Sequence, residues 1–259
     1  MHDCDRQLSA TMATVREHYD EVLSQHYSRM FGDFEAKVAE QQALLERLGT
    51  RARQGGSVAV DLGCGSGFQS IALARLGFRV LAIDFSRRLL DELNGRACGL
   101  SVVATAGDIR DVAGLAPSGV EVVACMGDTL SHLERLEDLD RVFEGAAGRL
   151  AAGGRRILTF RDLTGELREL DRFITLCRSD DLIMACFLEY EIATVKVHDL
   201  IWVRQPDGWH FRKGVYRKLR LAPTVVVDRL ENAGFAVARH EAPAGMVALV
   251  GTLMGSHRS

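Results

Sequence analysis

The stretch Val58-Ala-Val-Asp-Leu-Gly-Cys-Gly-Ser-Gly67 joins a short apolar run to three glycines at alternate positions. Apolar residues at helical spacing follow it as far as Leu76. A strand, a glycine-rich turn and a helix in this order are typical of a nucleotide-cofactor site in a doubly wound parallel sheet. Glycine lets the backbone turn sharply and lets a ligand approach where a Cβ atom would clash. The stretch therefore predicts a cofactor-binding turn directly after a buried strand.

The spacing of the glycines distinguishes between cofactors. Gly63 and Gly65 fit the first two positions of the dinucleotide pattern Gly-x-Gly-x-x-Gly, but Phe68 occupies the third. Asp61, just before the turn, places a carboxylate where it disfavours a pyrophosphate. A cationic ligand without phosphates suits this turn better than a dinucleotide does.

The motif Asp61-Leu-Gly-Cys-Gly-Ser-Gly67 resembles the first motif of the class I S-adenosylmethionine-dependent methyltransferases. The resemblance implies that the glycines contact the methionine part of the cofactor, and that the acid orders the loop and the amino-acid end. For this motif alone, an ordinary glycine-rich turn between core elements is the alternative. With the later motifs, the expected cofactor contacts are Tyr27, Asp61, Gly63, Cys64, Gly65, Asp84, Phe85, Asp108, Ile109 and Met126.

A second acid, Asp84, ends the apolar run at 78–83 and lies 21 residues after Gly63. A carboxylate at the end of the next strand can accept hydrogen bonds from both ribose hydroxyls. The family uses an acid at this position in the same way. The alternative is a helix N-terminal acid, because Ser86 and a helical pattern over 87–97 follow. Phe85 is expected to pack on the adenine.

A third acid, Asp108, follows a predicted strand at 101–105. In the family, an acid at this place accepts from the adenine amino group, and the backbone N–H of its neighbour, here Ile109, meets a ring nitrogen. The alternative is an Asp that caps a short helix. Acids at three successive strand ends favour the cofactor assignment.

The order of the predicted elements indicates an α/β fold with a doubly wound, mostly parallel, seven-stranded sheet of the Rossmann-like methyltransferase type. Strand and helix patterns alternate over 57–162, which is the arrangement that gives a parallel sheet. Residues 55–162 and 223–259 are predicted to form the cofactor-binding core, with a helix at 224–233 and a terminal strand pair. The core strands that precede this helix are expected at 57–62, 78–83, 101–105, 120–125 and 155–160.

Two further segments flank this core. Residues 1–54 have helical spacing and are expected to cover the cofactor. Residues 163–222 break the alternation, with strand patterns at 182–188, 193–204 and 209–221 and a hairpin turn at 205–208. This antiparallel insertion is interpreted as a cap or as an oligomer surface, through which a homodimer would form.

The methyl acceptor is expected after the fourth strand. Gly127-Asp-Thr-Leu-Ser-His-Leu133 is similar to the Gly-Asn-Ser-x-x-His-Leu stretch of glycine/sarcosine N-methyltransferase-like enzymes, with Asp128 in place of Asn. His132 is a candidate general base or orienting donor, against a purely structural role. Arg161 is a candidate clamp for a carboxylate or phosphate, against an ion pair with Asp162 or with a neighbouring Glu. The candidate substrate contacts are Asp128, Tyr190, His198, Trp202 and Tyr216.

Composition excludes several classes of protein. A net charge of −3 over 259 residues predicts no nucleic-acid partner, and no apolar run is long enough to span a membrane. Met1-His-Asp-Cys-Asp-Arg6 lacks the features of a signal peptide, so a cytoplasmic location is expected. The six cysteines are scattered without a Cys-x-x-Cys pair, which indicates free thiols and neither a disulfide framework nor a metal site. Cys64, Cys98, Cys125 and Cys186 are expected to be buried, because their neighbours are apolar.

We therefore expect a methyltransferase that uses S-adenosyl-L-methionine and acts on a small molecule by direct displacement, with nitrogen favoured over oxygen as acceptor. The cofactor carries the activated leaving group, so no metal is needed. An O-methyltransferase is the first alternative. A nicotinamide-dependent oxidoreductase is a second, against which the glycine spacing and Asp61 count. A catalytically inactive binding protein is the third.

Overall fold

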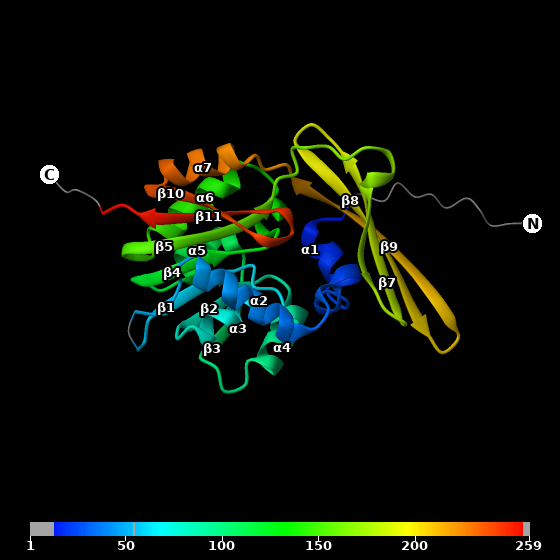
Figure 1. The fold of residues 1–259 in the computed structure, drawn as a ribbon, viewed down its shortest axis with the longest axis horizontal. Coiled ribbons are helices and arrows are strands. Elements are labelled where there is room, and N and C mark those ends of the chain that lie inside the picture. Colours follow the sequence, from blue (N-terminus) through cyan, green and yellow to red (C-terminus); the bar gives the residue numbers. More distant parts are fainter. Residues whose placement is uncertain (1–12, 54, 256–259) are drawn as a thin grey trace, which may run out of the picture.

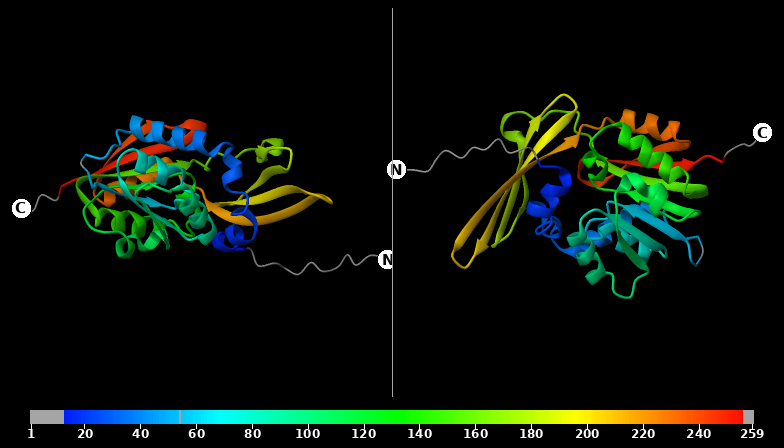
Figure 2. Two further views of the ribbon diagram at one scale, coloured as in Figure 1. Left: turned by 90° about the horizontal axis from the view of Figure 1, so that it is seen from below. Right: turned by 180° about the vertical axis from the view of Figure 1, so that it is seen from behind.

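The computed structural model describes residues 13–53 and 55–255, which form a seven-stranded sheet with helices on both faces and a separate four-stranded sheet (Figure 1). The expectations about a signal peptide and about Cys4 concern residues 1–12, which lie outside the described residues. Residues 13–31, called the N-terminal segment below, lie between the two sheets, as both further views also show (Figure 2).

The seven-stranded sheet has the strand order β10-β11-β5-β4-β1-β2-β3. The five strands from β3 to β5 are parallel, and β11 is antiparallel to both of its neighbours. The chain order reverses between β1 and β4, and ligands in such sheets bind beyond the carboxyl ends of the strands at that switch point. The strands are β1 (Val58–Leu62), β2 (Arg79–Asp84), β3 (Val102–Ala106), β4 (Val120–Cys125), β5 (Leu150–Arg161), β10 (Phe235–Glu241) and β11 (Met246–Leu253).

Helices cover both faces of this sheet and bury two apolar clusters against it. One cluster joins the sheet to α2 (Phe34–Arg47), α3 (Phe68–Arg75) and α4 (Arg87–Arg96). The other joins it to α5 (Val112–Leu115), α6 (Glu137–Ala147) and α7 (Pro223–Asn232). The seven-stranded, mostly parallel architecture expected from the sequence is therefore confirmed.

The N-terminal segment is more broken than its helical spacing suggested. A capping box between Thr14 and Glu17 starts the short helix α1 (Val15–His18), which continues into a π-helical turn over Tyr19–Leu23. A 3₁₀ turn follows at Ser28–Phe31, and Gly32, with a φ of +75°, ends it before α2 begins. A left-handed φ of this kind suits glycine and stops a helix.

The insertion forms the four-stranded antiparallel sheet, in the order β6-β7-β8-β9. The hairpin between β8 (Thr194–Gln205) and β9 (Gly208–Leu219) pairs Gln205 with Gly208, as its turn residues predicted. The strand β7 (Leu182–Tyr190) also matches its prediction. The edge strand β6 (Phe173–Arg178) was not predicted, because charged residues flank it closely and its pattern is short.

The cysteine expectation holds except at one position. Cys64, Cys125 and Cys186 are buried and free, whereas Cys98 is exposed. Cys98 lies in the turn between α4 and β3, where Gly99 has a φ of +79° and the chain reverses at the surface. Apolar neighbours in the sequence therefore misled the prediction for Cys98, because burial depends on the turn.

Candidate active site

A cavity of about 1030 Å³ opens at the carboxyl ends of the central strands. Its wall is shared by three parts of the chain: the core loops after β1, β2, β3 and β4, the N-terminal segment, and the inner face of the four-stranded sheet. The predicted cofactor and acceptor positions thus share one continuous space. Predicted site residues that line it are Tyr27, Gly63, Gly65, Asp84, Phe85, Asp108, Ile109, Met126, Asp128, His132, Arg161 and Tyr216.

The glycine loop after β1 is packed too tightly for side chains. A Cβ atom on Gly63 would lie 2.2 Å from Cγ2 of Thr129, and one on Gly65 would lie 3.1 Å from the ring of Tyr27. Both glycines have left-handed backbone, with φ values of +69° and +53°. The side chains of Thr129 and Tyr27 therefore occupy the space that these glycines leave open, and the Tyr27 ring packs directly on Gly65.

Asp84 ties the loop to the end of β2. Its Oδ2 accepts a hydrogen bond from the Gly65 N–H at 2.9 Å, and its Oδ1 accepts from the Ser86 N–H at 2.8 Å. The side chain is 6% exposed and lines the cavity, and burial raises its pKa despite these hydrogen bonds. Each carboxylate oxygen has a second lone-pair direction, so the contacts leave acceptor capacity for a ligand.

Asp61 and Cys64 lie beneath the loop and are not among the described residues that line the cavity. Asp61 is 1% exposed and accepts a hydrogen bond from the Ser70 hydroxyl at 2.6 Å. Burial raises the pKa of Asp61 to about 7 and raises that of the Cys64 thiol well above its usual range. Asp61 therefore orders the start of α3 from below in this structure.

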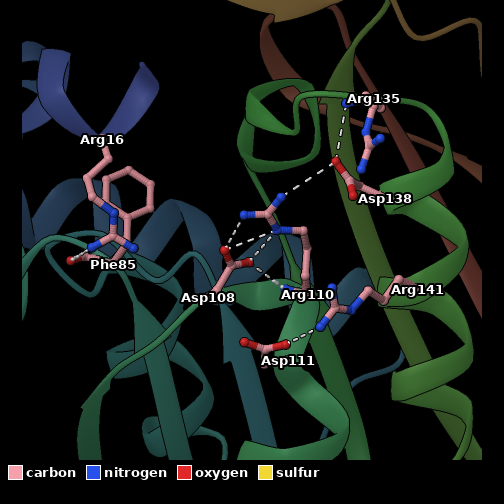
Figure 3. Close-up of polar contacts among 8 residues, drawn as sticks. All are labelled: Arg16, Phe85, Asp108, Arg110, Asp111, Arg135, Asp138 and Arg141. Atoms are coloured by element: carbon pink, nitrogen blue, oxygen red, sulfur yellow. Dashed lines mark hydrogen bonds and ion pairs between the residues drawn. The ribbon is translucent and has the colours of Figure 1, made fainter. Parts of the chain in front are cut away.

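Asp108 is engaged by an arginine that the sequence reasoning did not consider (Figure 3). Arg110 donates to both carboxylate oxygens of Asp108, with contacts of 2.6 and 3.0 Å, and its guanidinium also lies 3.8 Å from Asp138. Burial acts to raise the pKa of Asp108, but these hydrogen bonds outweigh it and hold the pKa below its usual range. Asp108 also accepts from the Arg110 backbone N–H, as the capping alternative required.

The N-terminal segment reaches the cofactor side of the cavity through Phe85. The Arg16 guanidinium lies 5.1 Å from the centre of the Phe85 ring and donates to its carbonyl oxygen at 3.3 Å, as Figure 3 shows. Tyr19 meets the same ring edge-on at 5.5 Å. Phe85, which is expected to pack on adenine, is therefore held in place by Arg16 and Tyr19 of the N-terminal segment.

The end of the cavity where the sequence predicts the methyl acceptor is built around a partly buried ion pair. Lys218 of β9 lies 2.9 Å from Oδ2 of Asp128, and Nε of Arg161 lies 3.4 Å from the same oxygen. Burial acts to raise the pKa of Asp128, but the Lys218 ammonium outweighs it and lowers that pKa to about 2. Arg161, which ends β5, thus forms an ion pair with Asp128 of the loop after β4. Lys218 is not among the candidate residues named from the sequence, yet its side chain is only 14% exposed.

His132 stands beside this pair and is neutral. Burial, with the Lys218 charge, lowers its pKa to about 3. Its Nε2 lies 3.3 Å from the Tyr19 hydroxyl, and its ring stacks on Tyr216 with centroids 5.6 Å apart. A neutral imidazole can donate one hydrogen bond and accept another, but a pKa this low makes it a weak proton acceptor.

Three candidate substrate residues are not brought to the described cavity wall. His198 and Trp202 lie on the outer face of the four-stranded sheet, where His198 contacts Glu189 at 2.9 Å and Trp202 packs on Phe211. Successive residues of a strand point to opposite faces, and Val195, Val197 and Ile201 take the buried face. Tyr190 ends β7, where its hydroxyl accepts from the Leu167 N–H at 3.2 Å.

Residues 13–53 and 55–255 contain no group of three or more His, Cys, Asp or Glu side chains arranged to hold a metal ion. Within the same residues, no helix is both long and apolar enough to cross a membrane.

Comparison with known proteins agrees with the fold and the motifs. Residues 59–154 match the family of methyltransferase domains. The cypemycin N-terminal methyltransferase of Streptomyces sp is 33% identical over 138 residues, which are 49% of this chain and 56% of the relative. The ubiquinone biosynthesis O-methyltransferase of Xanthomonas euvesicatoria is 32% identical over 117 residues, 44% of this chain and 47% of the relative. The chain thus spans about half the length of the curated relatives it matches.

A solved structure extends the likeness beyond the matched domain. CalS10 with bound S-adenosylmethionine is an amino pentose methyltransferase of Micromonospora echinaspora involved in calicheamicin biosynthesis. It aligns with 88% of this chain and 95% of its own, with a TM-score of 0.70 and 17% sequence identity. At this identity, the likeness shows a shared fold.

Proposed function

Since residues 59–154 of this chain match the family of methyltransferase domains, we propose that the protein is a class I S-adenosylmethionine-dependent methyltransferase, which transfers the methyl group of S-adenosylmethionine to a small molecule. One observation carries the proposal. A single cavity joins the strand ends that bear Asp84 and Asp108 to a second compartment around Asp128 and His132. A cofactor in the first compartment would present its methyl group to an acceptor in the second.

The chain's own residues would supply positioning and exclusion of water. S-adenosylmethionine brings an activated methyl group on a sulfonium, which a nucleophile displaces directly. We propose that Asp84 accepts from the ribose hydroxyls, that Ile109 and Asp108 meet the adenine, and that Gly63, Gly65 and Tyr27 hold the amino-acid part. Asp61 and Cys64 would support this loop from beneath. Alignment of nucleophile, methyl group and sulfur is then the main catalytic contribution.

The acceptor atom we propose is a neutral amine nitrogen. A neutral amine attacks without prior loss of a proton, whereas a hydroxyl needs a base in the transition state. The low pKa of His132 makes it a poor base, and the Asp128 carboxylate can accept an amine N–H. An oxygen acceptor is the second candidate, supported by the likeness to a ubiquinone biosynthesis O-methyltransferase. The nicotinamide-dependent and inactive alternatives have no support in the matched family.

We also propose that two copies of the chain associate through the outer face of the four-stranded sheet. Aromatic side chains gather there in two pairs, Trp202 with Phe211 at 4.9 Å and Phe173 with Phe187 at 4.7 Å. Phe173 is 56% exposed and Phe211 is 50% exposed. Water contact with large apolar side chains is unfavourable, and exposed patches of this kind mark interaction sites. A second copy can present the same patch in a two-fold arrangement.

A cytoplasmic location without a nucleic-acid partner completes the proposal. The net charge of −3 gives no general attraction to phosphates. The described cysteines are free, which suits a reducing compartment.

The proposed function is tested by binding and by methyl transfer. Calorimetry with S-adenosylhomocysteine and with NAD compares the two cofactor classes, and we expect saturable binding of the first alone. Radiolabelled S-adenosylmethionine is then incubated with panels of small amines and phenols. Label transferred to amines supports the proposal, and label transferred only to phenols would favour the O-methyltransferase. Cofactor binding with no transfer to any acceptor across wide panels would support the inactive alternative.

A further inference from the structure

We propose that His18 and Asp199 form a positioning pair that holds the N-terminal segment against the four-stranded sheet and so sets Tyr19 against His132. The inference rests on the proposed function only in assigning the His132 compartment to the acceptor. His18 ends α1, and Asp199 lies in the middle of β8, 181 residues further along the chain.

The two side chains meet in a fully buried place. Nε2 of His18 lies 2.7 Å from Oδ2 of Asp199, and the side chains are 1% and 2% exposed. A carboxylate only accepts, so Nε2 donates. Within the described residues, Nδ1 of His18 has no hydrogen-bond partner. The contact with Asp199 is therefore what offsets the loss of water by this ring.

The ring of His18 is fixed from two further sides. It stacks on Tyr216 with centroids 4.4 Å apart and an angle of 28° between the planes. Gly214 lies behind it, and a Cβ atom there would approach Nδ1 and Cε1 to 2.6 Å. The sheet thus provides a hydrogen bond, a stacking partner and a gap of matching size. These features come from β8 and β9, and all of them serve one residue of the N-terminal segment.

Tyr19, the residue after His18, links the fixed position of His18 to His132 in the proposed acceptor compartment. Tyr19 follows His18 directly and begins the π-helical turn. Its hydroxyl lies 3.3 Å from Nε2 of His132, and the two rings meet edge-on at 5.5 Å. Tyr216 lies against both histidines, because its ring also stacks on His132 at 5.6 Å. A shift of His18 would therefore move Tyr19 and loosen the packing around His132.

The arrangement positions groups and carries no proton between them. The contacts of Tyr216 with His18 and His132 are ring stacking, so no hydrogen-bond chain connects Asp199 to His132 among the described contacts. The His18–Asp199 pair acts on His132 only by fixing the position of the N-terminal segment and thus of Tyr19. Its loss is expected to alter the surroundings of His132 while the glycine loop and Asp84 stay intact.

The test uses the full chain and needs no acceptor. In Asp199→Leu, we expect amide hydrogen exchange over residues 13–24 to rise at least tenfold and the ring NMR signals of His132, assigned with His132→Gln, to shift. Asp199→Asn keeps an oxygen that accepts from Nε2, so both readouts should stay close to wild type. Asp181→Asn is the matched control, because Arg29 and Asp181 join the same two parts of the chain through an exposed ion pair of 2.5 Å.

A second variant covers the case in which Asp199→Leu does not fold. His18→Ala/Asp199→Leu removes the ring that stacks on Tyr216 together with both polar partners, and it leaves no buried polar group alone, which is tolerated better than loss of one partner. We expect the same loss of protection and the same shift of His132. Wild-type exchange and an unchanged His132 signal in a folded variant would overturn the positioning pair. Failure of the wild type to bind S-adenosylhomocysteine would instead count against the proposed function.

Discussion

At the scale of single residues, Asp84 carries the most direct test of the cofactor site. Asp84→Ala removes the acceptor proposed for both ribose hydroxyls and releases the N–H groups of Gly65 and Ser86. We expect a loss of about 1.5–3 kcal/mol in affinity for S-adenosylhomocysteine, the scale of hydrogen bonds to a charged group. Calorimetry measures it, with the exposed Asp91→Ala of α4 as control. Equal affinity in wild type and Asp84→Ala would count against the whole cofactor assignment.

Gly65 tests the close packing of the loop. Gly65→Val places a branched side chain against the Tyr27 ring, 3.1 Å from the new Cβ atom, at a φ of +53°. We expect S-adenosylhomocysteine binding to be abolished while the circular dichroism of the fold is retained. Gly55→Val is the control, because no atom lies within 4 Å of its Cβ position and its φ is not left-handed. Normal binding by Gly65→Val would show that a ligand does not approach the backbone there.

Asp61 gives the protein a specific dependence of stability on pH. Its pKa is raised by burial to about 7, whereas the unfolded chain has the usual value of about 4. Between these values the folded protein holds a proton that the unfolded chain has lost, so the free energy of unfolding falls as the pH rises. Asp61→Asn removes this effect and keeps an acceptor for Ser70. As the pH rises from 5 to 8, the free energy of unfolding of the variant should increase by about 2–3 kcal/mol relative to that of the wild type. Urea unfolding at both pH values measures the difference, and a constant difference would contradict the raised pKa.

At the scale of elements, the four-stranded sheet presents two unlike faces. Its inner face lines the cavity, and its outer face carries the exposed aromatic pairs. Side chains along β8 alternate between these two faces. His198 and Trp202 therefore lie on the outer face, away from the cavity, although they belong to the strand predicted from the sequence. We therefore propose that the insertion combines the two roles that the sequence presented as alternatives, with the inner face covering the cavity and the outer face binding a second copy.

The outer face is tested by a single charge. Phe211→Lys places an ammonium group in the aromatic patch, where a partner copy would have to desolvate it. We expect the wild type to sediment as a dimer and the variant as a monomer at the same concentration. Val103→Lys is the matched control, because Val103 is 64% exposed on β3, an edge strand of the seven-stranded sheet and not part of the four-stranded one. A wild-type monomer at high concentration would refute the proposed association.

At the scale of the whole molecule, the acceptor compartment exists only where three parts of the chain meet. Asp128 and His132 come from the core, Tyr19 from the N-terminal segment, and Tyr216 and Lys218 from the insertion. Arg161 lies at the end of β5, with its Nε 3.4 Å from Asp128. Exclusion of water by a bound acceptor would strengthen the electrostatic interactions in this compartment.

Two substitutions test this assembly once an acceptor is identified. His132→Ala and Arg161→Ala are expected to lower turnover by about tenfold or more, because they disturb alignment at the methyl group. Their affinity for S-adenosylhomocysteine should change by less than threefold, since neither residue belongs to the proposed cofactor contacts. Steady-state kinetics and calorimetry provide the two readouts. A selective loss of cofactor affinity in either variant would contradict the proposed division of the cavity.

Local patterns in the sequence were sufficient for the parallel sheet and the positions of the strand-end acids. A strand, a turn or a helix depends on residues close along the chain, so Gly63, Gly65 and the alternation over 57–162 identified the architecture. The same patterns located Asp84 and Asp108 at neighbouring strand ends, because parallel strands place their carboxyl ends at one edge. The short edge strand β6 carried too little pattern to be found.

The partners of the charged side chains were decided by the tertiary structure. Lys218 and Asp128 are 90 residues apart, and His18 and Asp199 are 181 residues apart. The sequence identified Asp128 and His132 as candidates, but not Lys218, Arg110 or the His18–Asp199 pair. Burial and distance set the energy of such contacts, and both depend on how the N-terminal segment and the insertion pack against the core. The sequence by itself thus determined the type of sheet and its cofactor edge, and only the packing of distant segments decided which groups face the acceptor.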